Sequence, residues 1–180
     1  DVPAPPPWDI LVRTDIDLKV EISDDFSCNW LQIQENAADP THTFFLHARW
    51  LRHLGLRDDS RFGRPFRKFG IQPFEWGILK KWEYGGENGG KGWGNLLVFP
   101  NILRLESEMH WRVPIDRERT RIFWITAEPK TASAAREVRL VRQPARRDAD
   151  GRYNMRSFPS QDAMACETQG TIASRQREIL

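Results

Sequence analysis

The chain has 180 residues, a length typical of one domain, and its 39% hydrophobic and 29% charged residues are those of a globular protein rather than a disordered or fibrous one. Lysine and arginine number 27 against 25 aspartates and glutamates, an excess too small to indicate binding to nucleic acid or to an anionic membrane surface. The composition therefore predicts neither kind of partner, and partners have to be inferred from a site.

The two cysteines, Cys28 and Cys166, allow one disulfide at most, and the sequence shows no apolar signal segment at its start. No apolar run approaches the ~18 residues that a membrane span requires. We therefore expect a cytoplasmic protein in which both cysteines pack as small hydrophobic side chains.

The N-terminal half predicts a linker, a strand and a helical region. Residues 1–14 open with a proline-rich run and are expected to be an extended linker, followed by one domain over residues 15–180. Apolar and charged residues alternate over 15–23, as in a half-buried strand. From 28 to 53 the apolar spacing lengthens and predicts two helical stretches, with Asp39 and Pro40 as the N-cap and first residue of the second stretch.

The central part predicts an antiparallel meander. A basic loop is expected around 61–67, followed by a strand over 76–84 whose aromatic residues share one face. The glycine-rich stretch 85–94 lacks the Gly-Lys-Ser/Thr of a phosphate-binding loop and is interpreted as a hairpin connection. Three further strands are expected at 96–105, 109–115 and 121–127.

The C-terminal part predicts a charged segment and a long helix. The seven arginines between 135 and 156 are interpreted as a solvated loop or sheet edge. Ser160 is expected to cap a helix that runs from 161 toward 180 and is interrupted at 169–170. The order of elements predicts the α+β class, with helices on one face of an antiparallel sheet.

Two of the four histidines, His42 and His47, lie five positions apart in the helical region, shortly after Asp39. At about 100° per residue their side chains would diverge by about 140° on a regular α-helix. A wider π-type turn would bring them to one side, and such turns are frequent at functional sites. The spacing by itself leaves two interpretations open, a metal site or ordinary helical residues capped by Asp39.

Two segments of the sequence, one that ends at His47 and one at the C-terminal end, resemble a known family. The run from Cys28-Asn-Trp to Asp39-x-x-His42-x4-His47 is similar to the iron-site segment of Rieske non-heme iron oxygenases, in the phthalate dioxygenase-like and aromatic O-demethylase branch. The run over 161–180 resembles the terminal helix of that family, and a weaker match covers 110–116.

The resemblance implies a set of site residues. His42 and His47 would be the imidazole ligands and Asp162 the carboxylate ligand of one mononuclear Fe(II), a set that leaves coordination positions open for dioxygen. Asp39 would be catalytic, linking the ligand His42 to the Rieske cluster of a neighbouring subunit. Taken alone, Asp162 is equally explained as an acid in the first turn of a helix.

The resemblance also implies a fold and a function. The fold would be a helix-grip domain of the START or Bet v1 type, with a curved antiparallel sheet around a long C-terminal helix. The function would be that of an oxygenase component that hydroxylates or O-demethylates an aromatic compound with dioxygen. Electrons would come from NAD(P)H through a flavin or ferredoxin-type reductase and a Rieske 2Fe-2S cluster, and the full-length protein would be a homotrimer.

Neither Cys28 nor Cys166 has the following histidine that a Rieske cluster requires. The resemblance therefore implies a fragment truncated at both ends, with the cluster in a missing N-terminal domain, and we expect the fragment alone to be inactive. His53 is expected to be structural, and His110 is a candidate for the substrate pocket.

Two other classes of function compete with the oxygenase. One is a helix-grip module that binds an apolar ligand without redox chemistry. The other is a zinc hydrolase, for which the sequence lacks His-Glu-x-x-His. The sequence does not name the substrate, and it does not separate ring dioxygenation from O-demethylation.

Overall fold

The computed structural model describes residues 6–55, 66–84, 91–130 and 135–176. Its helical elements are α1 (Asp9–Val12), α2 (Trp30–Ala38), the π-helix η1 (Thr43–Ala48), α3 (Arg49–His53) and α4 (Phe158–Glu167). Its strands are β1 (Ile16–Ile22), β2 (Phe66–Phe74), β3 (Gly77–Tyr84), β4 (Lys91–Val98), β5 (Ile102–Arg104), β6 (Glu108–Pro114), β7 (Thr120–Pro129) and β8 (Val138–Arg142).

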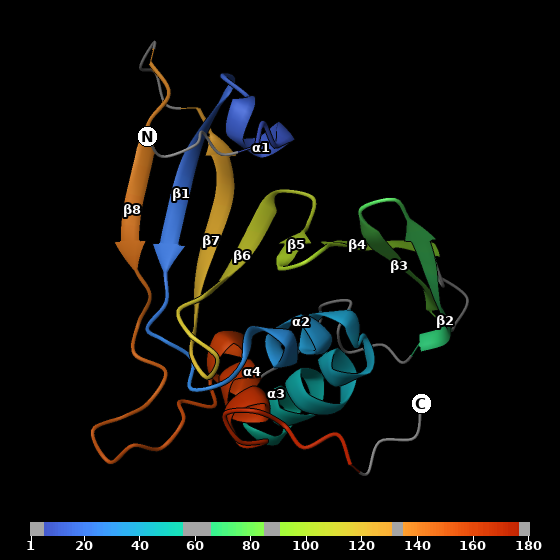
Figure 1. The fold of residues 1–180 in the computed structure, drawn as a ribbon, viewed down its shortest axis with the longest axis vertical. Helices are drawn as coiled ribbons and strands as arrows, with labels where there is room; N and C mark the ends of the chain where they lie inside the picture. The colour runs from blue at the N-terminus through green and yellow to red at the C-terminus, as the bar shows by residue number, and fades with distance from the viewer. Residues whose placement is uncertain (1–5, 56–65, 85–90, 131–134, 177–180) are drawn as a thin grey trace.

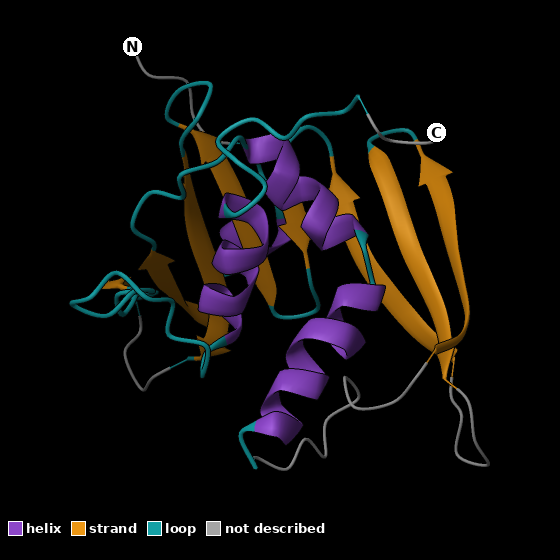
Figure 2. Ribbon diagram, turned by 90° about the horizontal axis from the view of Figure 1, so that it is seen from below, coloured by secondary structure: helices purple, strands orange, loops and turns teal. Residues whose placement is uncertain are grey.

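The strands form one eight-stranded sheet in the order β2-β3-β4-β5-β6-β7-β1-β8. All neighbouring pairs are antiparallel except β1 and β8, which run parallel at the edge. The sheet curves, and α2, α3 and α4 lie together on one side of it (Figures 1 and 2). The predicted α+β class with a helix-grip arrangement is thus confirmed, as is the strand predicted over 15–23.

The alternation along β6 separates the two faces of the sheet. Met109 is fully buried and packs with Ile10 of α1 and with Ile125 of β7 in a cluster on the outer face. His110 and Arg112, which alternate with it, point to the inner face that carries the helices, because successive strand side chains point to opposite sides. On β6, the outer face is therefore apolar, and the inner face presents polar and charged side chains to the helices.

The helical region agrees with its prediction in detail. Asp39 ends α2, and its carboxylate accepts hydrogen bonds from the backbone N–H groups of Thr41 and His42 at 2.7 and 3.1 Å. Pro40 follows as the first residue of the next helical stretch, where its missing N–H is not needed. That stretch widens into η1, so the predicted π-type turn is present.

The N-terminal segment departs from the extended linker predicted over 1–14. Residues 9–12 form the short helix α1, and Ile10 is only 1% exposed because it covers the outer face of the sheet. Residues 1–5 lie outside the described part of the chain, and the domain boundary at 15 stays a prediction.

Three predictions for the central part also differ from the structure. Arg67, expected in a loop, belongs to β2, a strand that the sequence pattern did not reveal, whereas 56–65 lie outside the described residues. Trp76 lies in the turn between β2 and β3 and is 65% exposed, so the aromatic face starts later than predicted. The strand predicted over 96–105 is two strands, β4 and β5, separated by a turn at 99–101. The hairpin between β3 and β4 is confirmed by their antiparallel register, but residues 91–94 of the predicted connection belong to β4, and residues 85–90 lie outside the described part.

The C-terminal helix is shorter and earlier than predicted. Its N-cap is Ser157 rather than Ser160, and α4 ends at Glu167, so residues 168–176 are not helical. The side chain of Gln32 in α2 fixes the chain beyond α4, since it donates to the carbonyl of Gly170 and accepts from the N–H of Ala173. This tertiary contact replaces the helical hydrogen bonds that the sequence pattern suggested.

The long arginine-rich segment supplies the edge strand β8, as one of its two interpretations predicted. Across the described ranges, none of the helices combines the length and apolar character needed to cross a membrane.

Candidate metal centre

The π-helix η1 brings His42 and His47 to one side of the helical segment. His42 precedes η1 and His47 lies in its last turn, and their ring centroids are 5.0 Å apart. In a π-helix the backbone bonds join residues five apart, so two side chains at this spacing lie above one another. The widened turn therefore removes the divergence that an α-helix would impose.

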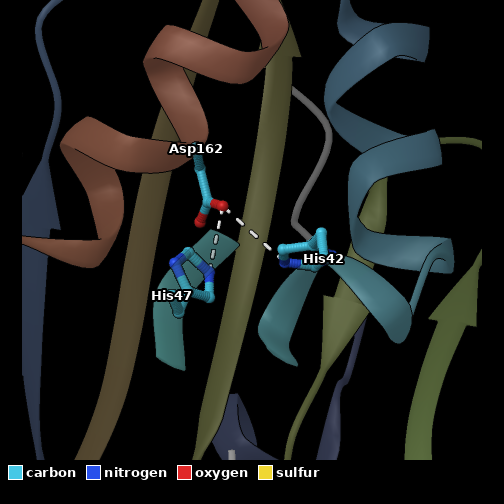
Figure 3. Close-up of side chains that lie close together, drawn as sticks. All are labelled: His42, His47 and Asp162. Carbon is cyan, nitrogen blue, oxygen red and sulfur yellow. Dashed lines mark ion pairs between the residues drawn. The ribbon is translucent and has the colours of Figure 1, made fainter. Parts of the chain in front are cut away.

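Asp162 completes the group from α4. Its Oδ1 lies 3.2 Å from Nε2 of His47 and 3.7 Å from Nε2 of His42 (Figure 3). The three ligand atoms lie within 4.8 Å of one another. Within the described part of the chain, His42, His47 and Asp162 are the cluster of histidine and carboxylate side chains that is close enough to share a metal ion. Because α4 begins at Phe158, Asp162 is not in the first turn, and a favourable interaction with the helix dipole no longer explains it.

Hydrogen bonds to acceptors fix the tautomer of both rings. Nδ1 of His42 donates to the backbone carbonyl of Asp39 at 2.5 Å, and Nδ1 of His47 donates to Oε1 of Gln161 at 2.7 Å. The amide of Gln161 is oriented by its own NH₂, which donates to the carbonyl of Met155. Nε2 of each ring faces Asp162, and because Nδ1 carries its own proton, loss of the Nε2 proton leaves a lone pair there that can bind a metal.

Two opposing effects set the pKa values of His42, His47 and Asp162, namely burial and the attraction between the imidazole rings and the carboxylate. Burial acts to raise the pKa of Asp162, but the hydrogen bond from His47 and the two nearby rings outweigh it and hold that pKa below its usual value. Burial lowers the pKa of His42, whereas for His47 the carboxylate of Asp162 overcomes the burial effect and raises the pKa. The carboxylate is therefore ionised at neutral pH and ready to act as an anionic ligand.

This donor set fits a divalent first-row metal. Imidazole nitrogen and carboxylate oxygen bind such ions at about 2.0–2.2 Å, so ligands at right angles around one ion lie about 3 Å apart. The observed separations of 3.2 and 3.7 Å are close to that value. Two histidines and one carboxylate on one face are typical of non-heme iron sites with open positions.

Asp39 lies beside the cluster, but its carboxylate does not hydrogen-bond the imidazole of His42. Its backbone carbonyl, not its carboxylate, accepts from Nδ1 of His42, since the nearer carboxylate oxygen is 4.0 Å from that nitrogen. The carboxylate instead caps the following helical stretch and also accepts from the hydroxyl of Thr41. A link from Asp39 to a neighbouring cluster remains a prediction.

A cavity of about 410 Å³ adjoins the three residues between the helices and the inner face of the sheet. Its apolar wall includes Ile33, Leu103 and Trp124, and its polar lining includes His110. This volume lies within the range of ~300 to 1,000 Å³ that is usual for small-molecule sites. The pocket role considered for His110 therefore has a structural basis, and its Nε2 is 3.0 Å from a carboxylate oxygen of Glu108.

Two cations in this cavity, Lys80 and Arg112, were missed by the sequence analysis. Lys80 lies two positions before Trp82 on β3, so strand alternation places both side chains on the buried face, and this spacing was the available signal. Arg112 belongs to the inner face of β6, and its position opposite the apolar Met109 and Trp111 was the available signal.

The remaining candidates are placed as predicted. His53 at the end of α3 is exposed and packs against Trp50, with ring centroids 5.1 Å apart, away from the metal cluster. Cys28 and Cys166 are free thiols, completely buried in one apolar cluster with Phe26 and Ile33. Burial and the neighbouring Cys28 raise the pKa of Cys166, so its thiol stays protonated.

One curated protein is similar to this chain over most of the chain's length. The 5,5'-dehydrodivanillate O-demethylase oxygenase subunit of Sphingobium sp. (strain NBRC 103272 / SYK-6) is 30% identical over 159 residues, which are 85% of this chain. The chain is thus similar in sequence to an oxygenase subunit of an O-demethylase. The resemblance to the O-demethylase branch is thereby confirmed, and the chain spans 37% of the length of this relative.

Among solved structures, the chain is similar to a carbazole-bound oxygenase in its ferredoxin complex, from carbazole 1,9a-dioxygenase. The TM-score is 0.40 at 15% identity, over 92% of this chain and 49% of that one. No protein-family model matches the chain.

Proposed function

We propose that this chain is the iron-binding catalytic part of the oxygenase component of a Rieske-type system. It acts with dioxygen on an aromatic compound, by hydroxylation or by O-demethylation. The observation that carries the proposal is the convergence of Nε2 of His42, Nε2 of His47 and Oδ1 of Asp162 within 4.8 Å. The family of the relative supports an oxygenase rather than a hydrolase with the same ligand set.

Each residue has a distinct part in this function. His42, His47 and Asp162 would hold mononuclear Fe(II), which supplies the place where dioxygen is activated. The carbonyl of Asp39 and the amide of Gln161 hold the two rings in the tautomer that binds a metal. The apolar wall of the cavity excludes water and places an aromatic ring beside the cluster.

The partners follow from the chemistry. Activation of dioxygen at one iron requires an external electron, and a Rieske 2Fe-2S cluster in another part of the full-length protein, fed by an NAD(P)H-dependent reductase, would supply it. We propose a homotrimer in the cytoplasm, in which the carboxylate of Asp39 lies on the route from the neighbouring subunit's cluster to His42. The carboxylate is 43% exposed, so a partner group can reach it.

The second candidate is a binding module that uses the cavity without redox chemistry. The cavity alone would support it, but such a module has no need of two histidines in the metal-binding tautomer. A preference of the protein for iron over zinc would distinguish the oxygenase from the binding module.

The test is anaerobic reconstitution of the full-length protein with Fe(II), followed by elemental analysis and competition with zinc. We expect one iron per chain in addition to the Rieske irons, lost in His47→Ala and kept in His53→Ala. The second variant removes a histidine of the same helical segment that is exposed and lies outside the cluster. Equal iron content in both variants, or no iron at the site in the unmodified protein, would rule out the proposed function.

A further inference from the structure

A lysine side chain is buried in the cavity beside the candidate metal centre. Lys80 on β3 is 5% exposed and lines the cavity together with Arg112 of β6, which is 3% exposed. Among the described residues, neither of them forms a salt bridge with a carboxylate. A buried ammonium without a counter-charge is costly, so a lysine in this position loses its proton more readily than a lysine on the surface.

One side of α2 holds both cations. Nη1 of Arg112 donates to Oε1 of Gln34 at 2.9 Å, and Nζ of Lys80 donates to the backbone carbonyl of Ala37. Gln34 and Ala37 are three positions apart on α2, so they lie on the same side of the helix. The amine of Lys80 is therefore held on the same side of α2 as a fixed guanidinium.

The hydrogen bond to Ala37 also orients the amine. One N–H of Lys80 is used by that carbonyl, so the lone pair of the neutral amine must point in another direction. The main chain at Lys80 is fixed as well, since a Cβ on Gly94 of β4 would lie 1.3 Å from the backbone oxygen of Lys80. Because the side chain lines the cavity, a ligand bound there can reach its nitrogen.

The charges around Lys80 favour the neutral amine. Burial, and next to it the charge of Arg112, lower the pKa of Lys80 to about 8, against a smaller opposing effect of Asp39. Glu108, a carboxylate of the cavity lining, is paired with His110. At pH 7 about 10% of amines with a pKa of about 8 are neutral, against less than about 0.1% of ordinary lysines.

From this arrangement we infer that Lys80 is a nucleophilic lysine and that the cavity binds an aromatic aldehyde covalently, as an imine. A lysine that is desolvated beside another cation is a usual form of such a nucleophile. The inference goes beyond the proposed function, because imine formation requires neither iron nor dioxygen.

The bonds and protons of this step balance without an oxidant or a reductant. The lone pair of Nζ attacks the carbonyl carbon, and one amine proton passes to the carbonyl oxygen, which gives a carbinolamine. The hydroxyl then leaves with the second amine proton as water, and a C=N double bond joins Lys80 to the ligand. Water reverses the reaction by the same steps.

The lining of the cavity selects a ligand with a ring. Its volume is about 410 Å³, and its apolar wall includes Ile33, Leu103 and Trp124. An aromatic ring buries apolar surface against this wall and holds its aldehyde group near the amine for longer than a free aldehyde would stay there.

The test traps the imine in the full-length protein. The probe is 4-methoxybenzaldehyde with cyanoborohydride, which reduces the C=N bond to a stable secondary amine that peptide mass spectrometry locates. Nα-acetyllysine in the same mixture is the reference for an ordinary amine. We expect Lys80 to react at least about tenfold faster than the reference at pH 7, because more of its amine is neutral. Equal rates would overturn the inference without any variant.

The pH dependence gives a second measurement. The ratio of the two rates should fall as the pH rises above about 8, because the amine of Lys80 is then already neutral while the reference still loses protons. A ratio that stays constant between pH 7 and pH ~10 would show that Lys80 titrates as an ordinary lysine, and it would overturn the inference.

Three variants locate the reaction. Lys80→Arg keeps the positive charge but forms no imine, so the fast adduct should be lost, whereas Lys81→Met, outside the cavity lining, should retain it. Arg112→Gln removes the cationic neighbour, so the pKa of Lys80 should rise and its rate at pH 7 should fall several-fold. Thermal unfolding shows that each variant is folded, and a fast adduct that persists in Lys80→Arg would contradict the assignment.

Two further probes test the ligand class. 4-Methoxytoluene has a similar ring without a carbonyl and should protect Lys80 from labelling. Formaldehyde forms the same kind of imine without a ring, and we expect its preference for Lys80 over the reference to be at least about threefold smaller. Absence of protection, or an equal preference with formaldehyde, would place the reaction outside the apolar cavity and overturn the inference.

Iron content is measured on the same samples. Lys80 should be labelled with and without bound iron, so failure of the labelling contradicts the aldehyde site alone. Absence of iron at the triad in the unmodified protein contradicts the proposed function, whatever the labelling of Lys80.

Discussion

Gln161 fixes the ring of His47 from the position next to Asp162. Its Oε1 accepts a hydrogen bond from Nδ1 of His47 at 2.7 Å, and Oδ1 of Asp162 lies 3.2 Å from Nε2 of the same ring. Consecutive residues of α4 therefore contact the two nitrogens of one imidazole, Gln161 by accepting from Nδ1 and Asp162 by lying beside Nε2. Gln161 is completely buried, so solvent does not compete for this bond.

We predict that Gln161→Leu weakens iron binding. Leucine has no acceptor for Nδ1–H of His47, so the ring loses the hydrogen bond that fixes its orientation. Removal of such a partner of a metal-binding histidine usually lowers metal affinity about 10–100-fold. Gln161→Glu keeps an acceptor and should retain most of the affinity. The measurement is iron affinity by competition with a chelator, together with thermal unfolding. Unchanged affinity in a folded Gln161→Leu protein would show that packing alone orients the ring.

Asp39→Asn should separate the role of the backbone carbonyl of Asp39 from the role of its carboxylate. The backbone carbonyl still accepts from His42, so iron binding should stay within about threefold of the unmodified protein. Under the proposed function, loss of the charge should slow NADH-driven turnover of the full-length protein, measured with its reductase. Turnover unchanged by Asp39→Asn would contradict a role in electron delivery.

Asp39→Ala should instead destabilise the helical segment that carries both histidines. The carboxylate caps it through the N–H groups of Thr41 and His42, and loss of such a cap typically costs about 1 kcal/mol. Urea unfolding of the two Asp39 variants side by side provides the check, because the asparagine side chain can still cap. An equal loss of unfolding free energy in both variants would indicate that the charge of Asp39, and not its capping hydrogen bonds, stabilises the helical segment.

Gly94→Ala should destabilise the hairpin that positions Lys80. A Cβ at this position would lie 1.3 Å from the backbone oxygen of Lys80, so β3 and β4 would have to separate. We expect a loss of about 2–4 kcal/mol in the free energy of unfolding, the range of strong overpacking. Gly70→Ala on β2 is the matched control, because its Cβ would meet no atom within 4 Å. A Gly94→Ala protein as stable as the control would contradict the close approach of the strands.

Glu167 should make stability depend on pH. Burial acts to raise its pKa, but hydrogen bonds from Tyr153 and Arg147 outweigh this effect and hold the pKa below its usual value. A lowered folded-state pKa means that ionised Glu167 stabilises the fold above the unfolded pKa of ~4.3, and that this contribution is lost as pH falls through the folded value. The side chain is 6% exposed, so the contribution is not greatly screened.

Glu167→Gln tests this dependence. The variant should lose about 3 kcal/mol of stability at neutral pH, because it leaves the buried Arg146 with a neutral partner and removes the charge that pairs with the exposed Arg147. The difference from the unmodified protein should shrink in acid, where Glu167 of the unmodified protein becomes protonated as well. Unfolding curves across this pH range give the difference directly, and a gap that widens in acid would refute the sign.

Local patterns in the sequence determined much of this protein. The alternation over 15–23 defined β1, because a strand with one buried face must alternate. Asp39 and Pro40 marked the start of the second helical stretch, because capping depends only on neighbouring residues. The spacing of His42 and His47 required a π-type turn if the two were to act together, and the motif resemblance joined Asp162 to them.

Only the tertiary structure decided the features that depend on contacts between distant segments. The break at 169–170 was predicted from the sequence, but the chain beyond it does not return to a helix, and Gln32, far away in sequence, binds it instead. The tautomer of His47 depends on Gln161, which is 114 residues away in sequence, and the bond from Lys80 to the carbonyl of Ala37 joins β3 to α2. A sequence pattern records the preference of each residue for its neighbours, whereas the charge of a cavity is set by which segments the fold brings together.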